Sequence, residues 1–287
     1  MGLSRSQRRR TPRTVRRTRT RGSPERSAGG EWAKISRLSA FELIAIVAAG
    51  FGAGTINAVI GSGTLITFPV LLAFGYPPVL ANVSNNIGLV PGAVSTAWAY
   101  RRELAGGAAR LRRYAPATAS GAVAGAILLL ELPAESFQAI VPVLIAASLV
   151  LIVLQPRITA AVLARRRRER PHGGPLLVAG IFATGVYGGY FGAGQGILLF
   201  GLLASSLGGE LREVNAIRAV LAGLANLVAA IAFLFIAEVA WGAAALIAVG
   251  AAAGGLAGAG IGRRLPDLWL RAVIVTVGLA AIAQLAL

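Results

Sequence analysis

Residues 53–72 read Ala-Gly-Thr-Ile-Asn-Ala-Val-Ile-Gly-Ser-Gly-Thr-Leu-Ile-Thr-Phe-Pro-Val-Leu-Leu. This stretch lies within an apolar segment, residues 41–75, that is too long for one straight membrane helix, because a span needs about 20 apolar residues. Gly61 and Gly63 interrupt the segment, so we expect a broken helix or a re-entrant hairpin. An irregular backbone at membrane depth persists only where protein buries it or where it lines a wet cavity.

The composition of the whole chain also favours a membrane protein. Of the 287 residues, 56% are hydrophobic and 14% are charged, whereas soluble domains carry about 25% charged residues. Apolar segments follow one another at residues 41–75, 79–99, 114–131, 137–155, 175–205, 214–237, 240–262 and 268–287. We therefore expect an all-α polytopic membrane protein with about 8–10 transmembrane helical segments.

The two halves of the chain resemble each other in sequence. The matches are Gly121 with Gly254, Gly125 with Gly258, Leu132-Pro133 with Leu265-Pro266 and Asn82 with Asn215, all at an offset of 133. The first glycine break matches a second one, Gly192-Ala193-Gly194, at an offset of 131. We expect two homologous transmembrane repeats, residues 39–156 and 175–287, each with one broken or re-entrant glycine-rich segment. The paired small residues also suit close helix packing in lipid.

Positive charge is concentrated at the N-terminus. The chain has 28 Lys and Arg residues against 11 Asp and Glu residues, and 12 of the 28 lie in residues 1–37. Residues 1–38 have few large apolar side chains, so we expect a disordered tail that rests on anionic lipid headgroups. No aromatic side chain separates the arginines from Arg5 to Arg26, and we expect no nucleic-acid partner.

The loop charges predict the orientation of the chain. Residues 101–113 and the linker 157–174 are rich in arginine, which predicts that loops 101–113 and 157–171 are cytoplasmic. Charge signs reverse between the halves, since Glu131 and Glu135 match a loop with Arg263 and Arg264. This reversal is typical of inverted repeats. A hairpin at the first break would place the tail outside, whereas a single crossing would keep it inside, and both alternatives stay open.

Polar residues inside the apolar segments form the candidate binding site. Glycine breaks expose backbone N–H groups at half-helix N-termini, which bind anions, and Asn, Ser and Thr side chains can replace hydration. Arg218 would neutralise a bound anion or, alternatively, anchor its helix at the membrane surface. The candidate substrate-binding residues are Asn57, Gly61, Ser62, Gly63, Thr64, Asn82, Ser84, Asn85, Gly192, Gly194, Gln195, Asn215 and Arg218. The glycine breaks taken alone are equally compatible with a close-packed bend.

The residue inventory argues against enzyme chemistry. The chain has no Cys and one His, which excludes disulfides, thiolate metal sites and clusters of several His ligands. No apolar segment combines Ser, His and Asp, so we expect no enzyme activity, no metal and no cofactor. Trp98, Tyr100, Trp241 and Trp269 lie at segment ends, as in an aromatic belt.

The stretch 53–72, together with Pro77-Pro78-Val-Leu-Ala-Asn82-Val-Ser84-Asn85 and Gly88-Leu-Val-Pro91-Gly92, resembles the sulfite exporter TauE/SafE family. The segment Gly188–Gly196 fits the duplicated architecture of that family. The resemblance covers about residues 40–287 and implies a multi-pass transporter of the bacterial inner membrane. It implies transport of small sulfur-containing anions, such as sulfite or organosulfonates, and we expect a secondary exporter that works by alternating access. A transporter of carboxylates or other anions, and a membrane assembly partner that transports nothing, remain alternatives.

Overall fold

The computed structural model describes residues 39–165, 174–208, 210–260 and 267–286, and every regular element in them is an α-helix. The helices are α2 (Ala40–Val59), α3 (Thr64–Ala73), α4 (Pro78–Ala99), α5 (Ala108–Glu131), α6 (Ala134–Arg165), α7 (Pro175–Tyr190), α8 (Gln195–Ser206), α9 (Leu211–Ile236), α10 (Trp241–Gly260) and α11 (Asp267–Ala286). This confirms the expected all-helical class. The predicted tail 1–38, linker residues 166–173 and the pair Arg263 and Arg264 lie outside the described residues.

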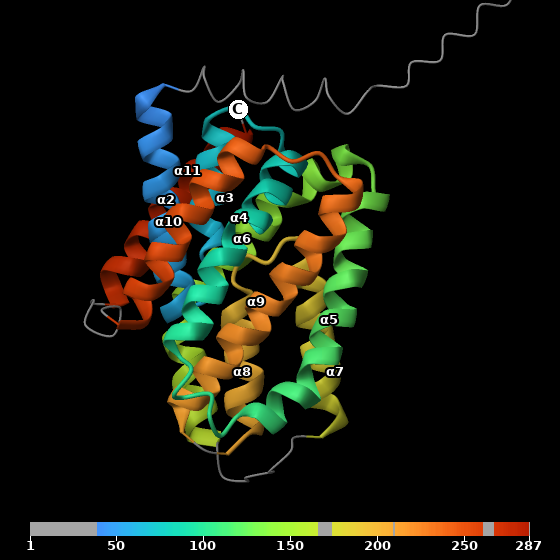
Figure 1. Ribbon diagram of the computed structural model, residues 1–287, viewed down its shortest axis with the longest axis vertical. Helices are drawn as coiled ribbons and strands as arrows, with labels where there is room; N and C mark the ends of the chain where they lie inside the picture. Colours follow the sequence, from blue (N-terminus) through green and yellow to red (C-terminus); the bar gives the residue numbers. More distant parts are fainter. Residues whose placement is uncertain (1–38, 166–173, 209, 261–266, 287) are drawn as a thin grey trace, which may run out of the picture.

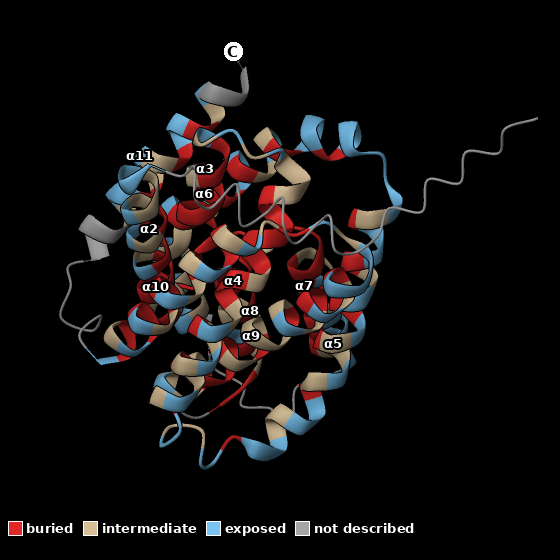
Figure 2. Ribbon diagram, turned by 45° about the horizontal axis from the view of Figure 1, so that its top comes forward, coloured by how far each residue is buried: buried red, intermediate tan, exposed pale blue. Residues whose placement is uncertain are grey.

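The helices form one bundle with an apolar outer surface. Five of the described helices, α2, α5, α6, α9 and α10, are long and apolar enough to cross a membrane. Large apolar side chains such as Leu176, Phe235 and Phe41 are 73–84% exposed. Figure 2 shows that buried residues line the interior of the bundle while exposed residues face outward. These features fit a polytopic protein whose outer surface contacts lipid.

Both glycine-broken segments form helical hairpins. The first consists of α2 and α3, and the second consists of α7 and α8. Helices α3 and α8 have 10 and 12 residues, so they are about 15–18 Å long, roughly half of a bilayer core. The first hairpin opens at one end of the bundle and the second at the other end (Figure 1). The bends therefore meet near the middle of the bundle.

The N-terminal end of the first hairpin is well defined. The Glu42 N–H donates to the Ser39 Oγ atom at 3.2 Å, and the Ser39 N–H donates to Glu42 Oε2 at 2.7 Å. This capping box starts α2. In Figure 1, α2 begins at the end of the bundle opposite the turn between α4 and α5. The turn between α4 and α5, which carries Arg101 and Arg102, thus lies away from the start of α2.

Glycines allow α2 to pack closely on α10, and α7 on α5. A Cβ atom at Gly254 would clash with the carbonyl oxygen of Phe51, and one at Gly121 would clash with that of Phe182. The glycines match at an offset of 133 and their partners at an offset of 131. Gly258 and Gly125 likewise approach Thr55 and Val186, which are again 131 residues apart. Residues that match in the sequence repeat therefore make matching contacts, each between the two halves.

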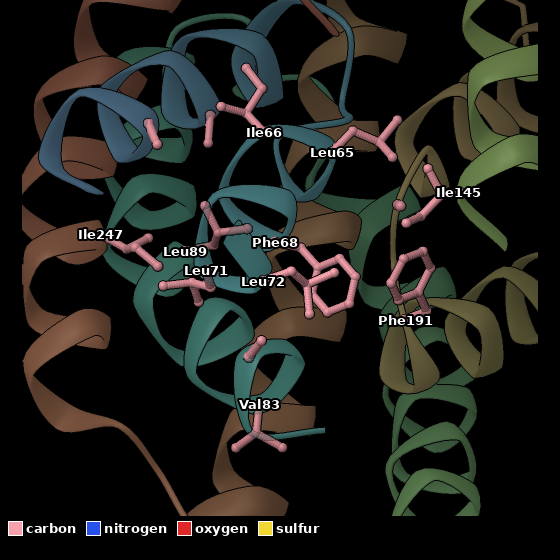
Figure 3. Packing of buried hydrophobic residues seen from close by; sticks show 14 of the residues in the cluster. Leu65, Ile66, Phe68, Leu71, Leu72, Val83, Leu89, Ile145, Phe191 and Ile247 are labelled. Carbon is pink, nitrogen blue, oxygen red and sulfur yellow. The ribbon is translucent and has the colours of Figure 1, made fainter. Parts of the chain in front are cut away.

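Aromatic rings connect the two hairpins. The rings of Phe68 in α3 and Phe191 at the end of α7 lie 5.3 Å apart in an edge-to-face arrangement, which Figure 3 shows at close range. Phe191 also contacts Phe137 of α6, with ring centroids 6.2 Å apart. Edge-to-face pairs stabilise beyond the area that they bury. The apolar core thus holds the bends of both hairpins together.

The close packing of α2 and α10 predicts a position-specific effect of added volume. We expect Gly254→Leu to push the helices apart and to destabilise the protein by at least about 1–3 kcal/mol. Gly260→Leu on the same helix is the matched control, because a Cβ there meets no atom within 4 Å. Thermal unfolding in detergent measures both variants. Equal melting temperatures for the two leucine variants would contradict the packing described.

Candidate functional site

The first bend joins the end of α2 to the start of α3. The N–H groups of Ile60 and Gly61 both donate to the carbonyl oxygen of Ile56, at 2.7 and 2.9 Å, and so end α2. Gly61 has φ +86°, a left-handed conformation that favours glycine. The Asn57 Oδ1 atom accepts a hydrogen bond from the Gly63 N–H at 2.7 Å. A side-chain amide of α2 therefore positions the start of α3.

The second bend has the same backbone form but a different side-chain support. The Gly192 N–H donates to the carbonyl oxygen of Tyr187 at 2.9 Å, and Gly192 has φ +81°. Gln195, the first residue of α8, donates from Nε2 to the carbonyl oxygen of Thr184 at 3.0 Å. A Cβ atom at Gly188 would clash with the Gln195 amide. Here the amide that fills the bend comes from the second helix of the hairpin instead of the first.

The tips of the two hairpins touch through their backbones. The Gly196 N–H donates to the carbonyl oxygen of Gly61 at 3.1 Å. A Cβ atom on Gly61 would lie 2.6 Å from the Gly196 Cα atom, and one on Gly196 would lie 2.5 Å from the Gly61 Cα atom. Only glycine fits at both positions. The two breaks predicted from the sequence are therefore brought into direct contact.

Arg218 of α9 lies against this contact and is fully buried, with 1% of its surface exposed. Its Nη2 group donates to the carbonyl oxygens of Ala58 and Asn57, at 2.9 and 3.3 Å, at the C-terminal end of α2. Its Nε and Nη1 groups have no hydrogen-bond partner. This burial rules out the alternative that Arg218 anchors α9 at the membrane surface. A buried guanidinium with unpartnered N–H groups is able to bind an anion.

Tyr100 belongs to the same group of contacts. Its hydroxyl donates to the carbonyl oxygen of Ala58 at 3.2 Å and accepts from Asn215 Nδ2 at 3.4 Å. The aromatic-belt assignment of Tyr100 is wrong, because its side chain is buried among helices. Trp98 and Trp241 are exposed, as a belt requires. The side chain of Trp269 lies outside the described residues.

A cavity of about 310 Å³ adjoins Arg218. Its lining residues are Val59, Ile60, Tyr100, Glu103, Gln155, Ile158, Thr159, Ile197, Phe200, Leu211, Arg212, Asn215 and Arg218. Glu103 lies just after α4 and Arg212 lies at the start of α9, at the end of the bundle where α4 turns into α5. The cavity therefore extends from that end of the bundle to the hairpin tips.

A second cavity, of about 20 Å³, lies beyond the hairpin tips. Its lining residues are Asn57, Gly61, Thr64, Ala93, Thr96, Gly192, Gln195, Gly196, Ala219, Ala222, Gly223 and Asn226. This volume holds about one water-sized group. Its walls come from both hairpins and carry neutral hydrogen-bonding side chains.

Two helices line both cavities with one continuous face each. On α4 and the turn after it the lining positions are 93, 96, 100 and 103, and on α9 they are 212, 215, 218, 222 and 226. A spacing of three or four residues keeps side chains on one helix face. Arg218 marks the boundary between the larger and the smaller cavity along α9. The geometry describes a route between α4 and α9 that the hairpin tips interrupt.

The predicted site residues fall into three groups. Those that line the smaller cavity are Asn57, Gly61, Thr64, Gly192 and Gln195, and those that line the larger one are Asn215 and Arg218. Ser62, Gly63 and Gly194 lie in the bends, where the buried Ser62 hydroxyl has no partner. Asn82, Ser84 and Asn85 are absent from the walls of these two cavities. No ligand tests these assignments, so the binding role of all thirteen residues stays a prediction.

The Asn82–Asn85 cluster makes contacts between elements. Asn82 Nδ2 donates to the carbonyl oxygen of Tyr190 at 2.9 Å, and the Ala240 N–H donates to Ser84 Oγ at 2.8 Å. The Thr67 hydroxyl donates to Asn85 Oδ1. These hydrogen bonds connect α4 to α7, to the start of α10 and to α3. The cluster faces the protein interior, and the partners found there are protein groups.

Sequence reasoning did not assign Tyr100, Gln155, Thr159 and Asn226 to the site. Asn226 offered a usable signal, because it is an amide on an apolar helix two turns after Arg218. Gln155 and Thr159 lie near the end of α6, where polar residues are common at membrane surfaces. Only the packing of α6 beside α8 places them at the cavity.

Comparison with known proteins agrees with this architecture. A family model described as "Sulfite exporter TauE/SafE" matches residues 46–285. The chain is 24% identical over 233 residues to the "Probable membrane transporter protein YfcA" of Escherichia coli K12, covering 81% of this chain and 85% of that protein. It is 27% identical over 228 residues to a "Probable membrane transporter protein" of Haemophilus influenzae, covering 78% and 85%.

A shorter match has higher identity. The chain is 32% identical over 161 residues to the "Probable membrane transporter protein ORF9" of a Sinorhizobium species, covering 55% of this chain and 59% of that protein. No solved structure matches the chain. The family match spans most of the sequence, and the relatives support a multi-pass membrane transporter. The chain belongs to the sulfite exporter TauE/SafE family.

Proposed function

We propose that the protein is a secondary transporter that exports small sulfur-containing anions, such as sulfite or organosulfonates, across the bacterial inner membrane. The observation that carries this proposal is Arg218, which is buried between two cavities with two unpartnered N–H groups. A buried ionisable side chain inside a membrane bundle is costly and marks a functional site. The family model supplies sulfite as the leading substrate. A membrane assembly partner would have no need for this arrangement.

The proposed mechanism is alternating access between two inverted repeats. The oppositely opening hairpins in Figure 1 and the matching glycine contacts at offsets of 131 and 133 support a pseudo-two-fold relation. Discontinuous helices that meet near the midplane are typical sites of substrate binding in such transporters. Parting of the Gly61 and Gly196 backbones would join the two cavities along α4 and α9. Arg218 would bind the anion while it passes.

The proposed orientation follows from the arginines. The turn between α4 and α5 and the end of α6 lie at the same end of the bundle (Figure 1). Arg101, Arg102 and Arg157 at this end favour a cytoplasmic location. The larger cavity would then be accessible from the cytoplasm, as an exporter ready to load requires. The start of α2 would lie on the periplasmic side.

Arg218 should be required for anion binding. We expect folded Arg218→Ala to lower the apparent affinity for sulfite by about 10- to 150-fold, because a hydrogen bond to a charged group contributes about 1.5–3 kcal/mol. Arg218→Lys keeps the charge and should lose less. Proteoliposome flux measures these values, and size-exclusion chromatography verifies folding.

Arg113→Ala serves as the control for the loss of an exposed arginine. Arg113 is exposed on α5 and lines neither cavity, so its removal should change the affinity far less than loss of Arg218. Sulfite flux of folded Arg218→Ala equal to that of the unaltered protein would reject the proposed role.

The proposed orientation predicts a one-sided pattern of thiol labelling. The chain contains no Cys, so a single introduced thiol reports its own position. We expect Thr159→Cys in the larger cavity to react with a membrane-impermeant maleimide from the cytoplasmic side only. Ala222→Cys in the smaller cavity should be protected from both sides until transport begins.

Two surface positions calibrate the labelling. Gly106→Cys in the exposed turn after α4 and Glu135→Cys in the exposed start of α6 lie at opposite ends of the bundle. They should react from the cytoplasmic and periplasmic sides, respectively. Labelling of Thr159→Cys from the same side as Glu135→Cys would invert the proposed direction of the cavity.

A further inference from the structure

We infer that the site selects singly charged anions, namely sulfonates and bisulfite, over dianions such as sulfite, sulfate and thiosulfate. This inference rests on the proposed function and specifies the charge of the substrate. It follows from the number of charges that face the two cavities, together with the low polarity of their surroundings. The sulfur chemistry itself comes from the proposed function.

Arg218 supplies the only buried charge among the described residues whose burial is defined. Glu103 and Arg212 line the outer part of the larger cavity and carry opposite charges. The smaller cavity is lined entirely by uncharged residues. The nearby Glu213 forms an ion pair with Arg110 at 3.0 Å, so it adds no net charge. The two cavities therefore present a net charge of one positive unit.

The helix dipoles at the hairpin tips add little to this charge. Each bend brings the negative C-terminal end of one helix next to the positive N-terminal end of the next. In the first bend these ends are Val59 of α2 and Thr64 of α3, and in the second they are Tyr190 of α7 and Gln195 of α8. Opposite partial charges a few residues apart largely cancel. The guanidinium of Arg218 thus dominates the local electrostatics.

One positive charge stabilises a monoanion far better than a dianion at this depth. The cost of removing an ion from water rises with the square of its charge, so a dianion costs about four times as much as a monoanion of equal size. Its attraction to a single cation rises only about twofold. The wall of the larger cavity also has apolar groups such as Val59 and Phe200 and neutral polar groups such as Gln155 and Thr159, none of which supplies a second positive charge. A dianion would enter with one charge uncompensated.

The hydrogen bonds that Arg218 already makes also favour binding of only one negative charge. Nη2 is occupied by the carbonyl oxygens of Asn57 and Ala58, whereas Nε and Nη1 are unpartnered. Nη1 lies against Gly61 and Gly196, so these groups could serve one anion once the hairpin tips part. Asn215 can add a neutral amide donor from the same face of α9. Such a site satisfies one negative charge and the hydrogen bonds of an oxyanion without a second cation.

Flux measurements on the unaltered full-length protein in proteoliposomes test the inference directly. The probes are ethanesulfonate, which is a monoanion at any working pH, sulfate, which is a dianion, and sulfite at pH 6 and pH 8. We expect ethanesulfonate flux to be independent of pH and sulfate flux to be at least about tenfold lower. Sulfite flux should fall at pH 8, because bisulfite loses its proton near neutral pH.

The outcomes separate the inference from the proposed function. Sulfate flux equal to ethanesulfonate flux, or sulfite flux that follows total sulfite at both pH values, would overturn the charge selectivity while leaving sulfur-anion transport intact. Absence of flux for all probes would instead reject the proposed function, and the inference with it.

A positively charged side chain introduced into the cavity wall provides an independent gain-of-function test. Asn215 lies one turn before Arg218 on the cavity wall, so Asn215→Lys should raise the ratio of sulfate to ethanesulfonate flux by about tenfold or more. Gly106→Lys adds the same charge in an exposed turn and is the control. This control should not change the ratio. An unchanged ratio in folded Asn215→Lys would count against the inference, and the pH series decides independently if that variant does not fold.

Discussion

The backbone contact between Gly61 and Gly196 is the constraint on which the rest of the structure depends. Half-length helices leave polar backbone groups near the middle of the bundle, where neither water nor lipid headgroups satisfy them. The Gly196 N–H meets the Gly61 carbonyl, and the absence of both Cβ atoms lets the chains approach. The glycine pairs between α2 and α10 and between α5 and α7 then hold the two hairpins in place.

Side chains from the opposite half complete the ends of the first helix of each hairpin. Asn82 of α4 donates to the carbonyl oxygen of Tyr190 at the end of α7, and Arg218 of α9 donates to that of Ala58 near the end of α2. An amide has two N–H donors, whereas a guanidinium has five. The ends of these helices are therefore capped in a similar way in both halves, but only Arg218 carries a charge. In the proposed function, the repeated architecture therefore supports one anion site instead of two.

Much of the fold could be predicted because its signals are local. The lengths of the apolar segments, the two glycine breaks and the spacing of the small residues each depend on a short stretch of sequence. The rotation of each helix could not be predicted in the same way, because most segments are apolar on all sides. For this reason Tyr100 was assigned to the membrane surface, and Asn85 gave no indication that Thr67 would be its partner. Both placements depend on packing between distant segments.

The contact between Arg218 and the end of α2 also explains how one site could serve an empty and a loaded transporter. Without a substrate, the carbonyl oxygens of Asn57 and Ala58 provide partial negative charge for the guanidinium. With a bound monoanion, the charge is neutralised in full. The charge of Arg218 is therefore at least partly compensated both with and without a substrate. Movement of the hairpin tips does not leave a fully uncompensated buried charge, which would be costly. In the proposed mechanism, the two carbonyl groups therefore take the place of the substrate in the empty transporter, with a weaker interaction. A bound anion stabilises the charge of Arg218 further, but the site folds without it.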